Sequence, residues 1–310
     1  MDKYQSNLME AVAMTTTGVV LSQIQQDRFW RDGYIVVDGA VAPDALTRLR
    51  QQMDDWDNES RAHTEPYGEP TVDGRPRFDM GAEHSAERPA LRRINNPSEI
   101  SDDFNAAMTN APMVDMVADL IGPNVKYHHC KINTKLPGSQ TVVRYHQDFP
   151  YTPHTNDDVI TAMLLLDDVD EGNGCLMVVP GTHRGTIDSL FQGGTFTGMV
   201  APALEQDYLA RQVPIEGKAG AVCLMHTRLQ HGSEPNLSEN RRRAIYLCVY
   251  SAADAIPIAR NPMPSTLEGT IVRGKASATA RMIPLEVELP QQPKSASFFT
   301  VIGQDSASGD

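Results

Sequence analysis

The spacing of hydrophobic positions changes near residue 125. Before it, apolar side chains recur at steps of three and four residues, which indicates helices. From residue 125 to 250 they form short runs separated by turn residues such as Pro137-Gly138 and Pro180-Gly181, which indicates strands. The pattern predicts an all-β core with flanking helices.

The N-terminal part is expected to contain three helices and one strand. Pro43 begins the second helix, and Gly122 follows the third. Residues 57–100 are rich in Pro, Gly and charge without a clear period, so we expect a long ordered loop or lid there. The predicted helices are residues 22–31, 43–56 and 102–120, and the predicted strand is 34–37.

Short strands of even spacing follow. With helices gathered on the N-terminal side, they predict a jelly roll, a double-stranded β-helix of the cupin-like kind, buttressed by the N-terminal helices. The predicted strands are residues 126–134, 141–146, 159–166, 175–179, 221–225 and 244–250.

One domain is expected over residues 21–289. Residues 1–20 show no sustained periodicity, which predicts a loose segment. Residues 290–310 mix Gln, Pro, Ser, Gly and Asp, which predicts a flexible tail. The length of 310 residues also allows two smaller domains, but no boundary is evident between residues 21 and 289.

The charge of the chain argues against polyanionic partners. Lys and Arg total 27 against 40 Asp and Glu, a formal charge of −13, so the overall field repels phosphate backbones and anionic lipids. The apolar runs are far shorter than the ~20 residues of a membrane-spanning helix. We therefore expect neither a nucleic-acid nor a membrane partner.

The N-terminus and the cysteines favour the cytoplasm. The first residues lack the basic flank and apolar centre of a secretory signal. The four cysteines are far apart with no Cys-x-x-Cys pair, which favours reduced, buried thiols over disulfides or a zinc site.

The triplet His146-Gln147-Asp148 ends a predicted strand. Residues two apart in a strand point to the same side, so His146 and Asp148 can converge on one metal ion. A third ligand is expected from His231, 85 positions later, which a jelly roll can bring back to the same place. His226 is the alternative, but we expect it to pack beside the site.

Two histidines and one carboxylate leave three positions open on an octahedral ion, the arrangement of non-haem Fe(II) oxygenases. A 2-oxo acid can chelate at two of them and leave the third for O₂. Its distal carboxylate then needs a partner, for which a guanidinium is the strongest bidentate choice. Arg242, eleven residues after His231, is the candidate, and its neighbours Arg241 and Arg243 are expected to face away.

Several motifs in this order resemble those of the phytanoyl-CoA dioxygenase family, a branch of the Fe(II)/2-oxoglutarate oxygenases. The resemblance runs from about Ser22 to Tyr250. The motifs are Phe29-x-x-Asp32-Gly33-Tyr34, Tyr145-His146-Gln147-Asp148-Phe149, Asp170-Glu171-Gly172-Asn173-Gly174, Val179-Pro180-Gly181-Thr182-His183 and His231-Gly232-Ser233-x-x-Asn236 followed by Arg242.

The resemblance implies roles for individual residues. A carboxylate at Asp148, where the family's halogenases have a small residue, implies hydroxylation, desaturation or ring chemistry. The implied iron ligands are His146, Asp148 and His231; the implied 2-oxoglutarate residues are Arg242 and Ser233 at the distal carboxylate and Asn133 and Gln147 at the oxo-acid end; and Arg92, Arg93, Tyr127 and Tyr151 are implied to face the substrate.

We expect an enzyme that uses Fe(II), 2-oxoglutarate and O₂ to hydroxylate a small molecule. Specificity is expected from the loops 57–100, 150–158 and 186–212. Phytanoyl-CoA itself is not expected, because no clear basic cluster for the CoA phosphates is evident. Two alternatives stay open: a cupin-like isomerase or hydrolase that uses another divalent metal, and a non-catalytic small-molecule-binding protein.

Overall fold

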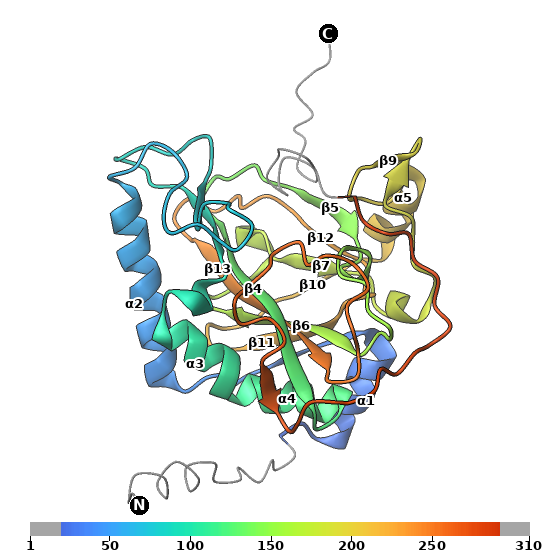
Figure 1. The fold of residues 1–310 in the computed structure, drawn as a ribbon. Coiled ribbons are helices and arrows are strands. Elements are labelled where there is room, and N and C mark those ends of the chain that lie inside the picture. Colours follow the sequence, from blue (N-terminus) through green and yellow to red (C-terminus); the bar gives the residue numbers. More distant parts are fainter. Residues whose placement is uncertain (1–19, 292–310) are drawn as a thin grey trace, which may run out of the picture.

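The computed structural model describes residues 20–291 (Figure 1). The segment 1–20 and the tail 290–310, predicted to be loose, lie almost entirely outside the described residues. The helices are α1 (Gln23–Asp32), α2 (Pro43–Ser60), α3 (Asp102–Asn110), α4 (Pro112–Ile121) and α5 (Pro202–Arg211). The strands are β1 (Tyr34–Val37), β2 (Phe78–Met80), β3 (Leu91–Asn95), β4 (Val125–Lys135), β5 (Val143–His146), β6 (Val159–Leu165), β7 (Leu176–Val178), β8 (Phe191–Gln192), β9 (Thr195–Phe196), β10 (Val213–Pro214), β11 (Val222–His226), β12 (His231–Ser233), β13 (Arg243–Ala252) and β14 (Ile271–Arg273).

Two antiparallel sheets form the core. The larger has the strand order β1-β11-β6-β13-β4-β3-β2, with β14 also paired to β4. The smaller has the order β10-β7-β12-β5. Neighbouring strands in these sheets are mostly distant in sequence, as in a jelly roll, so the predicted double-stranded β-helix is confirmed.

Helices α2, α3 and α4 cover the outer face of the larger sheet (Figure 1). Every second residue of β13 points to that face. Tyr246 and Tyr250 are fully buried there, and their hydroxyls donate hydrogen bonds to the carbonyl oxygens of Phe104 (3.1 Å) and Met108 (2.8 Å) on α3. The predicted buttressing by N-terminal helices is thereby confirmed.

The inner face of the larger sheet packs against the smaller sheet. Ile245 of β13 and Met163 of β6 share a buried apolar cluster with Tyr145 of β5 and Val178 of β7. The space between the two sheets is therefore the interior of the jelly roll, where such folds can hold a ligand.

Three local expectations were wrong. Within 57–100, β2 and β3 extend the larger sheet, and β3 escaped detection because Arg92 and Arg93 interrupt its apolar pattern. The helix expected over 102–120 is two helices, since Pro112 lacks an N–H donor and begins α4 instead of continuing α3. The expected loop 186–212 contains α5.

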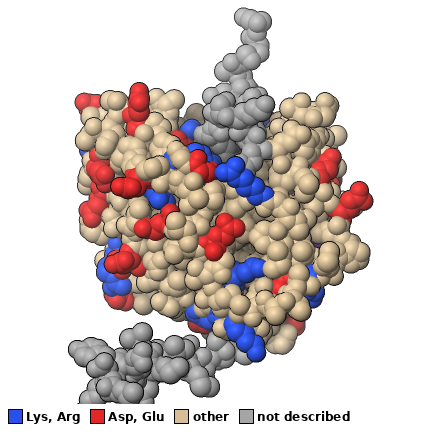
Figure 2. Space-filling view, viewed as in Figure 1, with Lys and Arg blue, Asp and Glu red and all other residues tan. Residues whose placement is uncertain are grey.

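Over residues 20–291, none of the helices is both long and apolar enough to cross a membrane. Acidic side chains are spread over the face shown in Figure 2, in keeping with the formal charge of −13.

Candidate active site

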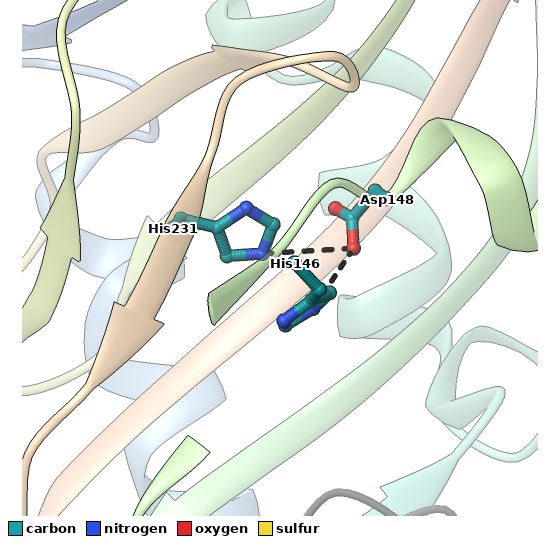
Figure 3. A group of neighbouring side chains, drawn as sticks. All are labelled: His146, Asp148 and His231. Atoms are coloured by element: carbon teal, nitrogen blue, oxygen red, sulfur yellow. Dashed lines mark ion pairs between the residues drawn. The ribbon is translucent and has the colours of Figure 1, made fainter. Parts of the chain in front are cut away.

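Three side chains that could hold a metal ion meet between the sheets. His146 ends β5, Asp148 follows two residues later, and His231 begins β12, directly opposite His146 in the sheet. Asp148 Oδ1 lies 3.7 Å from His146 Nε2 and 3.6 Å from His231 Nε2 (Figure 3). The three ligand atoms all lie within 4.8 Å of one another, close enough to share one divalent ion.

Backbone carbonyls orient both imidazoles. His146 Nδ1 is 2.8 Å from the carbonyl oxygen of Arg144, and His231 Nδ1 is 2.9 Å from that of Leu229. Because a carbonyl oxygen only accepts, each Nδ1 carries the hydrogen and each Nε2 keeps its lone pair for a metal. Burial lowers the pKa of His231 to about 4, so its ring is neutral near pH 7.

Asp148 is held in an ionised form. Burial alone would raise its pKa, but the neighbouring His231 and His146 and the positive charge of Lys131 hold that pKa below its ordinary value. Its second oxygen, Oδ2, accepts a hydrogen bond of 2.9 Å from the Thr161 hydroxyl on β6. Two imidazoles and one oriented carboxylate are a donor set that suits Fe(II) with three positions open.

Close approach of β12 to β5 depends on Gly232. A Cβ atom at this position would lie 2.8 Å from the carbonyl oxygen of Val143, nearer than real Cβ atoms come to backbone. The glycine between His231 and Ser233 therefore lets the two ligand-bearing strands pair.

A cavity of about 570 Å³ adjoins these three residues. Its walls come from both sheets, and the loop that includes Gly81, Glu83 and Arg88 forms part of its edge. That loop belongs to the segment expected to act as a lid. The volume is within the ~300–1,000 Å³ usual for small-molecule sites.

Four basic side chains on the inner face of the larger sheet line this cavity. Arg243 of β13 lies opposite Lys135 of β4, and Arg93 of β3 lies opposite Asn133, two residues from Lys131. Strand alternation and cross-strand pairing place all four on that face. Burial lowers the pKa of Lys131 to about 8 and the pKa values of Arg93 and Arg243 to about 10, and it holds that of Lys135 well below its usual value.

Arg242 is not part of the cavity lining. Its guanidinium donates to Asp167 (3.0 Å), Asp57 (3.0 Å) and Asp54 (3.1 Å) on the helix-covered side of the sheet. Arg243, which was expected to face away, lines the cavity. Its Nε atom is buried and has no hydrogen-bond partner among residues 20–291. The physical reason is strand alternation, which turns neighbouring residues to opposite faces.

Gln147 also lies outside the cavity lining. Its side-chain amide donates to the Arg228 carbonyl oxygen (2.6 Å) and accepts from the Asp188 N–H (2.9 Å), so it connects loops. The residues on either side of it, His146 and Asp148, line the cavity and it does not.

Ser233 and Asn133 do line the cavity, as expected. Ser233 Oγ accepts a hydrogen bond of 2.8 Å from Lys135 Nζ, and Asn133 Oδ1 accepts one of 3.3 Å from Arg93 Nε. Lys131 and Lys135 were missed by sequence reasoning. Their alternation with Ile132 along β4 was the signal that could have placed them on the inner face.

Of the residues expected to face a substrate, Arg92 and Arg93 line the cavity. Tyr127 belongs instead to the apolar cluster under the helices. The ring of Tyr151 makes an edge contact with His146, with centroids 5.7 Å apart. His226, the alternative third ligand, packs near Phe29 and Trp30 outside the group of possible metal ligands.

Comparisons with known proteins agree with this geometry. Residues 29–244 match the phytanoyl-CoA dioxygenase family. A probable alpha-ketoglutarate-dependent hypophosphite dioxygenase of Stutzerimonas stutzeri is 34% identical over 206 residues, 64% of this chain and 71% of the relative. A probable phytanoyl-CoA dioxygenase of Caenorhabditis elegans is 28% identical over 256 residues, 78% and 79% of the two chains.

The fold is shared with a solved structure. EctD from S. alaskensis superposes with a TM-score of 0.64 at 22% identity, over 86% of this chain and 91% of that one. The chain belongs to the phytanoyl-CoA dioxygenase family and is thus an Fe(II)- and 2-oxoglutarate-dependent dioxygenase with O₂ as co-substrate.

Proposed function

We propose that this enzyme hydroxylates a C–H bond of a small molecule and releases succinate and CO₂. The observation that carries the proposal is one cavity that joins the group His146, Asp148 and His231 to the buried guanidinium of Arg243. A divalent metal site and an anchor for a dicarboxylate are the two features that this chemistry needs.

His146, Asp148 and His231 would hold Fe(II), which with bound 2-oxoglutarate supplies the oxidation of a C–H bond by O₂. The protein keeps both Nε2 atoms available through the Nδ1 contacts to backbone carbonyls. Thr161 fixes the orientation of the Asp148 carboxylate. Asp148 also occupies the place that a halide would need, which favours hydroxylation over halogenation.

Arg243 would bind the distal carboxylate of 2-oxoglutarate. Its planar fork can pair with both carboxylate oxygens, and its buried Nε has no other partner among the described residues. Lys135 lies opposite it, and the Ser233 hydroxyl is 2.8 Å from Lys135 Nζ. Ser233 is two residues from His231 along β12, about 7 Å, so a short diacid can reach from the metal to this anchor.

A small primary substrate fits better than a large one. The two relatives are named for hypophosphite and for phytanoyl-CoA, compounds of very different size, so family membership leaves the substrate open. A cavity of about 570 Å³ that must also hold 2-oxoglutarate favours a small metabolite. The four buried, unpaired cysteines favour the cytoplasm as its compartment.

The test begins without O₂. Addition of Fe(II) and 2-oxoglutarate to purified, metal-free enzyme should produce the weak visible charge-transfer band of the chelate, and admission of O₂ should then release succinate. Candidate metabolites are screened for faster succinate release and for a hydroxylated product. Full turnover with zinc in the absence of O₂ would instead favour an isomerase or hydrolase, and binding without any turnover a non-catalytic protein.

A further inference from the structure

We propose that the primary substrate carries an oxyanion group, a phosphonate, phosphinate or carboxylate, and that Arg93 and Lys131 bind it. The inference deepens the proposed function and rests on it. It concerns the part of the cavity that the 2-oxoglutarate anchor does not use.

The lining of the cavity is basic. Arg93, Lys131, Lys135 and Arg243 come from three adjacent strands, and Arg93, Lys135 and Arg243 are at most 6% exposed. The lining carboxylates among the described residues are Asp148 and Glu83 at the edge. This basic interior contrasts with a chain whose formal charge is −13, so the positive charge is local to the cavity.

Bound 2-oxoglutarate would use only part of this basic lining. Its distal carboxylate would pair with Arg243, whereas Arg93 and Lys131 line the same cavity from β3 and β4. A second oxyanion at these two side chains would form charge-assisted hydrogen bonds with a guanidinium and an ammonium group.

The four cations form two groups. Lys135 and Arg243 face each other beside Ser233. Lys131 is four residues from Lys135 along β4, about 13 Å, and its electrostatic neighbours are Arg93 and Asp148. One group can therefore hold the distal end of 2-oxoglutarate while the other holds a second anion beside the metal ligands.

Apolar residues in the cavity lining indicate that the rest of the substrate is a hydrocarbon. Ile245, Leu247 and Met163 line the cavity from the same inner face of the sheet. A guanidinium and an ammonium next to short aliphatic walls suit a small molecule with one oxyanion and a short hydrocarbon part. The C–H bonds of that part would lie near the metal ligands.

The experiment uses the Fe(II)- and 2-oxoglutarate-loaded enzyme. The probes are methylphosphonate, propylphosphonate, methylphosphinate and butyrate, and the neutral matches are butyramide and 1-propanol. We expect at least one oxyanion to perturb the visible band anaerobically and to accelerate succinate release, whereas the neutral matches do neither. The phosphorus and carboxylate probes distinguish the two kinds of oxyanion.

Two variants test whether Arg93 and Lys131 bind the oxyanion of the substrate. Lys131→Met and Arg93→Met remove the charge but keep an apolar side chain that a buried position tolerates. Each should raise the KM for the active oxyanion about thirty-fold or more, while the 2-oxoglutarate KM changes less than three-fold. Lys218→Met is the matched control, because Lys218 is exposed and pairs with Asp168 outside the cavity.

The outcomes separate this inference from the proposed function. Loss of the visible band in the unmodified enzyme would overturn the proposed function itself. A normal band with preference for the neutral probes would overturn only the oxyanion inference. If the variants raised the 2-oxoglutarate KM and left the substrate KM unchanged, Arg93 and Lys131 would bind the co-substrate instead. Thermal unfolding of each variant verifies that it is folded.

Discussion

Thr161 donates a hydrogen bond of 2.9 Å to Oδ2 of Asp148, while Oδ1 of the same carboxylate lies 3.6 Å from His231 Nε2. The two residues come from different parts of the jelly roll, β6 of the larger sheet and the end of β5. The larger sheet thereby orients a ligand that the smaller sheet carries.

Thr161→Val should weaken Fe(II) binding because it removes this hydrogen bond at nearly constant volume. Loss of such an outer partner typically costs ~10–100-fold in metal affinity or activity. Anaerobic titration with Fe(II) measures the change. Thr47→Val on α2, whose hydroxyl donates to the Pro43 carbonyl oxygen in its own helix, is the control. Equal Fe(II) affinity in both variants would contradict an orienting role for Thr161.

Replacement of His146, Asp148 or His231 by Ala should abolish stoichiometric Fe(II) binding and turnover, since each removes one of three ligand atoms. Metal analysis after anaerobic reconstitution measures it. His63→Ala is the control, because that ring stacks on Tyr67 away from the cavity. Tight iron binding by His231→Ala would show that another residue completes the site.

Arg243→Ala should raise the 2-oxoglutarate KM about thirty-fold or more, because loss of one partner of a buried charge pair costs ~2–5 kcal/mol at ~1.4 kcal/mol per tenfold. Arg243→Lys keeps the positive charge but loses the planar guanidinium, so its 2-oxoglutarate KM should lie between those of the unmodified enzyme and Arg243→Ala. Arg242→Ala is the matched control and should leave this KM unchanged. A raised 2-oxoglutarate KM in Arg242→Ala, with an unchanged KM in Arg243→Ala, would show that Arg242 binds the distal carboxylate.

Arg242→Ala should instead lower the stability of the fold. It removes the Arg242 guanidinium from the half-buried carboxylate of Asp57 and the buried carboxylate of Asp167, at a cost of about 1–3 kcal/mol. Urea unfolding measures the loss. Lys218→Met, which breaks an exposed pair with Asp168, should cost less than about 1 kcal/mol. Equal stability of the two variants would mean that the contacts of Arg242 contribute little.

Acid should destabilise the metal-free protein through its buried histidines. Burial lowers the pKa values of His129 and His226 to about 3 and that of His154 to about 4. The unfolded chain, with pKa values near ~6.5, binds more protons below that pH, so stability decreases as pH falls from about 6.5 towards 4. Each histidine should contribute a loss of ~1.4 kcal/mol per pH unit in this window.

Urea unfolding at pH 7.5 and 5.5 measures this dependence. His154→Gln removes one of these buried histidines and should make the loss of stability smaller, by up to ~1.4 kcal/mol per pH unit. A variant with the same pH dependence as the unmodified protein would show that His154 is not one of the groups responsible.

The sequence alone was sufficient to predict the general fold and the convergence of His146 and Asp148 that the structure shows. His146 and Asp148 are two residues apart at the end of a strand, and alternation turns such residues to one side whatever the strand pairs with. The short runs between residues 125 and 250 specified the jelly roll in the same local way, because each run and its turn residues can be recognised without knowledge of the partner strands.

Only the tertiary structure decided which arginine enters the cavity and how the basic residues meet. Strand β13 is buried on both faces, with Tyr246 under the helices and Ile245 between the sheets, so its apolar pattern does not reveal whether Arg242 or Arg243 points inwards. The meeting of Arg93 with residues of β4 and β13 depends on strand pairing across long sequence separations. Pairing of that kind is set by the packing of the whole sheet, because a strand's own residues do not specify its neighbour or its register.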